Sequence, residues 1–109
     1  MPDITTDERG RRLFKLHREK AVESAIEKIR QNMGDMWKLY SDLDIEILNY
    51  ILGEVWISVD RRSWDRYTFS RLMKRDLEKI ISIGKDVKRG DSREQTAVDE
   101  VIRILGRAI

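Results

Sequence analysis

The feature that most constrains this chain is the lack of proline beyond position 2. Proline locks one backbone dihedral and has no amide hydrogen, so it interrupts helices and central strands. Pro2 is the only proline in this sequence. From Leu13 to Tyr40 apolar residues recur at spacings of three and four, and this apolar stripe includes Phe14 and His17. That spacing is the period of an amphipathic helix. No alternating segments joined by turn residues indicate a hairpin, so the chain is predicted to be all-α.

Several segments carry the signals that begin and end helices. Thr5 and Glu8 form a capping-box pattern, in which a hydroxyl and an acid three residues later satisfy free backbone amides. Ser41 begins a second segment, and overlapping capping boxes within residues 91–95 begin the last one. Lys88-Arg89-Gly90 supplies the cations and the glycine that typically end a helix.

These signals predict one α-helical domain over residues 1–109, a bundle of three to five helices of which two are long. Asp60 or Ser63 can cap a new helix, but neither Gly nor Pro interrupts the chain there. Residues 42–88 therefore fit one helix or two. Residues 43–59 are the most apolar segment, which belongs either in the middle of a bundle or at an apolar oligomer interface.

Few residues offer catalytic or metal-binding chemistry. The chain has no cysteine and a single histidine, His17, whose helical neighbours are not usual metal ligands. The six glycines are isolated, so no phosphate-binding loop is indicated. The acids that follow Ser41 suit the positive end of a helix dipole. We therefore expect no metal, no cofactor, no small-molecule substrate and no enzymatic activity.

Location in the cell is predicted from two missing patterns. The sequence has no apolar run of about 18 residues, the length that a membrane-spanning helix needs. Its first residues, MPDITTDERGRR, lack the apolar core of a signal peptide. We expect a cytoplasmic protein without membrane contact. High charge with two Asn, two Gln and no Cys is typical of a thermophile.

The net charge of +2 is small for a nucleic-acid-binding protein, but its distribution is uneven. Residues 34–59 carry a net charge of −4, whereas residues 60–89 carry +5. Neighbouring segments of helical domains usually pack together, so these two segments can compensate each other. Alternatively, the basic segment faces an acidic partner.

Residues 61–83 concentrate aromatic and basic side chains and are predicted to form one long helix, with a core face from Phe69 to Val87. The opposite face is predicted to be a surface that binds a partner or nucleic acid, formed by Trp64, Tyr67, Arg71, Lys74 and Arg75. Arginine and aromatic residues are frequent in protein interfaces, and they also contact phosphates and stack on bases. A third interpretation is that Trp64 and Tyr67 pack against the first helix while only the basic tips reach water.

Part of this stretch resembles the GINS subunits. Residues 67–80, YTFSRLMKRDLEKI, are similar to the tyrosine- and arginine-bearing helix of that family. The following GKDVKRGDSREQTAVDEVIRIL is similar to its break into a last helix, and KLHREKAVESAIEKIRQNMGDMWKLY more weakly resembles its first helix. The resemblance implies a helical A-domain without the family's β domain, and Arg71, Arg75 and Lys79 as interface or bundle-stabilising cations.

Together these observations predict a non-enzymatic interaction or scaffold subunit of an intracellular assembly, acting as a homo- or hetero-oligomer. The resemblance implies a DNA-replication factor from an archaeon or eukaryote, in a four-subunit ring that bridges the MCM helicase and its partner. The alternative is a small helical nucleic-acid-binding or packaging protein of a virus or plasmid. Its binding would weaken steeply with salt.

Overall fold

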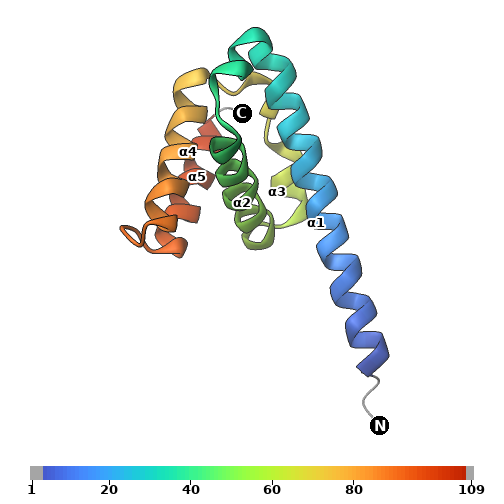
Figure 1. Ribbon diagram of the computed structural model, residues 1–109. Helices are drawn as coiled ribbons and strands as arrows, with labels where there is room; N and C mark the ends of the chain where they lie inside the picture. The colour runs from blue at the N-terminus through green and yellow to red at the C-terminus, as the bar shows by residue number, and fades with distance from the viewer. Residues whose placement is uncertain (1–3, 108–109) are drawn as a thin grey trace.

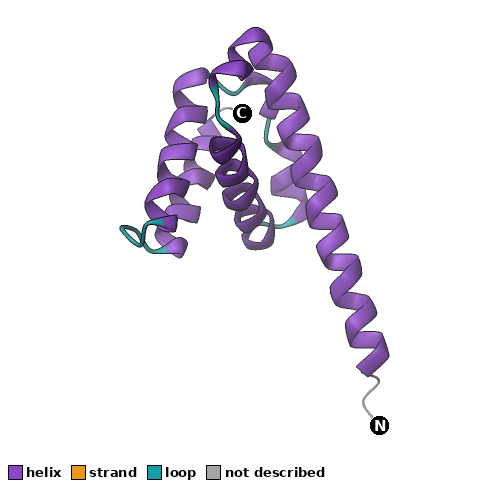
Figure 2. Ribbon diagram, viewed as in Figure 1, coloured by secondary structure: helices purple, strands orange, loops and turns teal. Residues whose placement is uncertain are grey.

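The computed structural model describes residues 4–107, with side chains from residue 9 onward. These residues form five α-helices and two short 3₁₀ helices (Figure 1). In chain order they are α1 (Ile4–Met33), η1 (Gly34–Leu39), α2 (Asp42–Ser58), α3 (Arg61–Arg66), η2 (Phe69–Arg71), α4 (Lys74–Lys88) and α5 (Glu94–Arg107). The described residues include no strand, which confirms the prediction of an all-α bundle (Figure 2).

Helix α2 is the centre of the bundle and contacts α1, α4 and α5. Its buried residues are Ile47, Leu48, Ile51, Leu52, Val55 and Trp56. The structure therefore places the most apolar segment in the middle of the bundle, the first of its two predicted positions. Only the ends of α2 leave large apolar side chains well exposed, Leu43 at 60% and Ile57 at 43%.

Helices α2 and α4 approach each other closely at Gly84. This glycine is buried in the interior of α4 and does not end the helix. A Cβ atom built on Gly84 would lie 2.5 Å from Cγ2 of Ile47 and 3.6 Å from the Ile47 carbonyl oxygen. Because real Cβ atoms do not approach other atoms so closely, the packing requires a residue without a side chain.

The predicted capping residues begin two of the helices. The Ser41 hydroxyl accepts a hydrogen bond from the Asp44 amide at 3.1 Å, and Asp44 Oδ2 accepts one from the Ser41 amide at 3.1 Å. This reciprocal pair is the capping box that begins α2. Asp60 Oδ1 accepts a hydrogen bond from the Ser63 amide at 2.8 Å and begins α3. Residues 42–88 therefore do not form a single helix.

Gly90 ends α4 as predicted. Its φ is +80°, and its amide donates to the Val87 carbonyl at 3.0 Å while the Asp91 amide donates to the Asp86 carbonyl at 2.8 Å. These two bonds form a Schellman motif, which favours glycine at this position. The predicted capping box of Thr5 and Glu8 involves side chains outside those that the structure describes.

The predicted long helix over residues 61–83 is wrong, because α3, η2 and α4 are separated by extended residues. In one continuous helix, Trp64 and Phe69 would point about 140° apart. The breaks turn both inward, and Trp64, Phe69 and Leu72 are 7%, 3% and 1% exposed. The Asn32 side-chain amide then donates to the Leu72 carbonyl at 3.0 Å, which ties the interrupted segment to α1.

Helix α1 has two different halves. Its C-terminal half packs on the core through Val22, Ala25, Ile29 and Met33, all 4% exposed or less. Its N-terminal half extends past the other helices (Figure 1). Every residue from 9 to 17 is exposed, and we call this segment the arm.

Candidate functional site

The predicted binding residues Trp64 and Tyr67 belong to an aromatic cluster beside α1. The ring centroid of Phe69 lies 5.0 Å from that of Trp64 and 6.3 Å from that of Tyr67. Trp64 is 7% exposed and Tyr67 is partly buried. The prediction that Trp64 faces outward is therefore wrong: Trp64 belongs to the buried core, and Tyr67 packs at its margin and stays partly exposed.

The other three predicted residues lie on the surface. Arg71 ends η2, Lys74 and Arg75 begin α4, and all three are exposed. Lys74 Nζ lies 3.8 Å from Glu78 Oε1, a surface ion pair that contributes little stability. The structure thus divides the predicted site into a packed aromatic part and an exposed basic part.

A groove of about 350 Å³ runs between α1 and the aromatic cluster. It is lined by Ala21, Ser24, Ala25, Lys28, Trp56, Arg61, Trp64, Asp65, Tyr67 and Phe69. The Arg61 guanidinium lies 3.5 Å from the Trp56 ring centroid and donates to the Trp56 carbonyl at 2.8 Å. The Phe14 ring contacts the same tryptophan, with centroids 5.0 Å apart. Arg61 and Phe14 of the same chain thus cover the Trp56 ring, and Phe14 links the arm to the bundle.

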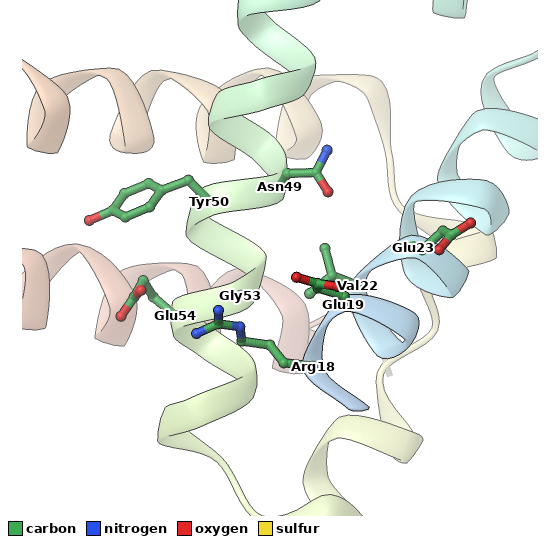
Figure 3. Close-up of a pocket in the computed structure, with 8 residues that line it drawn as sticks. All are labelled: Arg18, Glu19, Val22, Glu23, Asn49, Tyr50, Gly53 and Glu54. Carbon is green, nitrogen blue, oxygen red and sulfur yellow. The ribbon is translucent and has the colours of Figure 1, made fainter. Parts of the chain in front are cut away.

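A second groove, of about 490 Å³, separates α1 from α2 (Figure 3). It is lined by Arg18, Glu19, Val22, Glu23, Asn49, Tyr50, Gly53 and Glu54. Figure 3 shows Arg18 reaching from α1 across α2 beside Gly53, toward Glu54. Its Cδ atom lies 3.8 Å from the position that a Cβ on Gly53 would take. Three carboxylates against one guanidinium make the groove acidic.

Next to this groove, Tyr50 joins α2 to α5. Its hydroxyl donates to Glu94 Oε2 at 2.9 Å, and Lys88 Nζ lies 3.9 Å from its ring centroid. Burial, followed by the hydrogen bond to Glu94, raises the pKa of Tyr50 to about 12. Burial also raises the pKa of Glu54, and the neighbouring Glu94 raises it further. Hydrogen bonds from Glu54 and Tyr50 lower the pKa of Glu94.

The raised pKa of Tyr50 predicts a loss of stability in alkali. The folded pKa of about 12 lies above the ordinary value of 10.0, so the neutral phenol's contribution is complete below pH 10 and is lost as pH rises to 12. Over that interval, the free energy of unfolding should fall less steeply in Tyr50→Phe than in the wild type. Urea unfolding monitored by circular dichroism at several pH values measures both slopes, and equal slopes would contradict the prediction.

The arm is the most exposed part of the described helices. Leu13, Phe14 and Leu16 are 50%, 47% and 43% exposed. Residues 9–18 contain five basic side chains and no acidic one, namely Arg9, Arg11, Arg12, Lys15 and Arg18. The arm therefore combines exposed apolar side chains with dense positive charge, which is a combination suited to contact with an acidic macromolecular surface.

The sequence pattern placed the residues from Leu13 onward on the apolar stripe of the helix, and the burial that this implies is wrong for the arm. Leu13, Phe14 and His17 continue the helical apolar spacing but are all exposed, although the Phe14 ring still contacts Trp56 of α2. The run of basic residues without an acid between positions 9 and 18 was the available signal for an exposed element.

Neither a metal-binding group in the described residues nor a related protein assigns a function to this chain. Among the side chains that the structure describes, residues 9–107, no group of three or more His, Asp or Glu is placed to hold a metal ion. Within that described range, no helix is long and apolar enough to cross a membrane. No protein-family model, curated protein or solved structure matches the chain. The resemblance to GINS subunits and the binding role of Arg71, Lys74 and Arg75 stay predictions.

Proposed function

We propose that this chain is a non-enzymatic interaction module whose contact element is the arm of α1. The observation that carries the proposal is a helical segment, residues 9–17, in which every side chain is exposed. Short helices are marginal in water, and most of their stability in proteins comes from packing an apolar face. A partner that covers Leu13 and Leu16 would supply that packing.

The charge of the arm indicates which partner surface fits. Five basic residues without an acid between positions 9 and 18 favour an acidic surface. In this proposal the exposed Arg71, Lys74 and Arg75 are a separate, secondary contact. The assignment to a DNA-replication assembly rests on the GINS resemblance alone.

Nucleic-acid binding is the second candidate, and the same acid-free basic run favours it. Two further features of α1 favour a protein partner instead. Phosphate contacts do not require Leu13 and Leu16 to be exposed on the same helix. Glu19 and Glu23 follow the arm directly, and they would repel a phosphate backbone lying along α1.

Affinity capture with matched variants tests the proposal. The arm variant is Leu13→Ser with Leu16→Ser, and the control is Met73→Ser, which is 54% exposed and lies outside the arm. All three proteins should have the same stability within about 0.5 kcal/mol, because the altered side chains are exposed. The wild type and the control should retain the same macromolecules from an extract of the source cells, further copies of the chain included. The arm variant should retain far less.

Mass spectrometry of the retained material, together with amide hydrogen exchange of the complex, gives the result. The arm amides should exchange quickly in the free chain and slowly in the complex. Equal retention by the arm variant and the wild type would overturn the proposal. Failure of the wild type to retain any macromolecule would overturn it as well.

A further inference from the structure

One face of α1 carries charges of opposite sign in two separate blocks. Spacings of three and four place a single row of residues on this face, in the order Arg9, Arg12, Leu16, Glu19, Glu23 and Glu27. The face lies roughly a third of a turn from the buried stripe that includes Val22 and Ala25. The row therefore reads basic, apolar and then acidic along the helix, and it faces solvent.

Such a row is complementary to itself when a second copy runs in the opposite direction. We propose that two copies of this chain pair through antiparallel α1 helices, with the arm of each lying against the acidic part of the other. This inference rests on the proposed function, since it names the partner of the arm. A two-fold symmetric contact needs a self-complementary surface, and a helix with oppositely charged halves provides one.

The proposed contact has a definite register. If the helices cross between Leu16 and Glu19, then Arg12 of one copy lies opposite Glu23 of the other. Arg9 of one copy lies within one residue of the position opposite Glu27 of the other. The two Leu16 side chains lie near the point where the helices cross. With a rise of about 1.5 Å per residue, the row from Arg9 to Glu27 spans about 27 Å.

Among the side chains from residue 9 onward, most charges of this row have no ion-pair partner in the same copy. No ion pair joins Arg9, Arg12, Glu19 or Glu23 to another described side chain, whereas Glu27 is paired with Arg30 in its own helix. Glu19 and Glu23 also line the groove between α1 and α2, which leaves space for long basic side chains (Figure 3). On α4, by contrast, Lys85 lies 2.7 Å from Asp44 of α2 and is already paired.

Charge reversal on each block tests the pairing. The first variant is Arg9→Glu with Arg12→Glu, and the second is Glu19→Arg with Glu23→Arg. Each variant places like charges opposite each other in both halves of the dimer, so each should dimerise at least about tenfold more weakly. A chain with all four changes should dimerise again. A mixture of the two variants should form the heterodimer, because each arm then meets a groove of opposite charge.

The matched control is Arg62→Glu with Arg66→Glu, two exposed arginines of α3, which changes the net charge as much as the first variant does but outside α1. It should dimerise like the wild type. Sedimentation equilibrium should show wild-type mass rising from 13.0 kDa toward twice that value across the micromolar range. This rise in mass should need a higher protein concentration when the salt is increased from about 0.1 M to about 1 M. At the higher salt the electrostatic screening length shortens to about 3 Å.

Three results would overturn the pairing. They are a wild type that stays monomeric at low salt, reversal variants that dimerise like the wild type, and a four-fold variant that does not recover. Binding of the monomeric wild type to single-stranded DNA, made tighter by Glu19→Arg with Glu23→Arg, would assign the arm to nucleic acid instead. The wild type could also be monomeric and capture a protein that the arm variant fails to retain. In that case the partner of the arm is that protein and not a second copy, and the arm keeps its proposed role.

Discussion

Replacing Trp64 with alanine should lower the free energy of unfolding by about 3–5 kcal/mol, the range for removing a large buried aromatic side chain. Trp64 is only 7% exposed, and its ring centroid lies 5.0 Å from that of Phe69 and 6.5 Å from that of Tyr67. The substitution would leave a cavity where α3, η2 and α1 meet. Urea unfolding monitored by far-ultraviolet circular dichroism measures the change.

The matched control for this prediction is Arg71→Glu with Arg75→Glu. Both arginines are exposed, so this pair of changes should alter the free energy of unfolding by no more than about 0.5 kcal/mol. The two results together would separate the packed and exposed parts of the predicted binding face. A cost below about 1 kcal/mol for Trp64→Ala would contradict the packing role, because so small an effect is typical of a surface substitution.

Replacing Gly84 with alanine should destabilise the protein by about 1–3 kcal/mol, the usual cost of overpacking a core. Alanine is the better helix former by about 1 kcal/mol, but its Cβ would lie 2.5 Å from Cγ2 of Ile47. Ile47 cannot move away easily, because a β-branched side chain has one strongly preferred rotamer in a helix. Helices α2 and α4 would have to separate, which exposes the centre of the core.

Gly53→Ala is the control, since this glycine also lies inside a helix. Its new Cβ would meet only Cδ of Arg18 at 3.8 Å, an ordinary contact, so the change should stabilise the protein by about 0.5–1 kcal/mol. Thermal and urea unfolding of both variants should therefore give changes of opposite sign. Combining Gly84→Ala with Ile47→Ala should cost less than the sum of the two separate changes. Stabilisation by Gly84→Ala would contradict the close approach.

The helix boundaries that were predicted correctly depend on short-range chemistry. Ser41 with Asp44, Asp60 with Ser63, and Gly90 act through hydrogen bonds or backbone angles that involve residues within a few positions. A sequence pattern contains all the partners of such an interaction. The central position of the segment 43–59 was one of two that the sequence predicted, the other being an apolar oligomer interface, because a helix that is apolar on most sides must be covered.

The break between α3 and α4 could not be predicted in the same way. No Gly or Pro occurs there, and the helix period continues through it. The break follows from tertiary packing, because only a turn in the chain buries Trp64 and Phe69 on the same core. Gly84 is a similar case, because its role depends on Ile47, which is far from it in sequence. For this reason the exposure of the candidate binding face was predicted only in part: its basic residues are exposed, but its tryptophan is not.

The arm was missed because periodicity identifies a helical face but not what covers it. Leu13 and Phe14 fit the apolar spacing of α1 as well as Val22 does, yet only Val22 is buried. The extent of the bundle along α1 is set by the lengths of α2 and α3 and by where they turn. Those lengths depend on the break that the sequence pattern did not predict.

The division of α1 into a packed half and an exposed half affects how the sequence of this protein can evolve. Substitutions at Val22 or Ile29 must preserve the core, whereas substitutions from position 9 to position 17, Phe14 excepted, carry almost no folding cost. Asn32 fixes the packed half to the rest of the molecule through Leu72 and does not depend on the arm. The contact surface can therefore acquire a new partner by mutation while the fold that presents it stays the same.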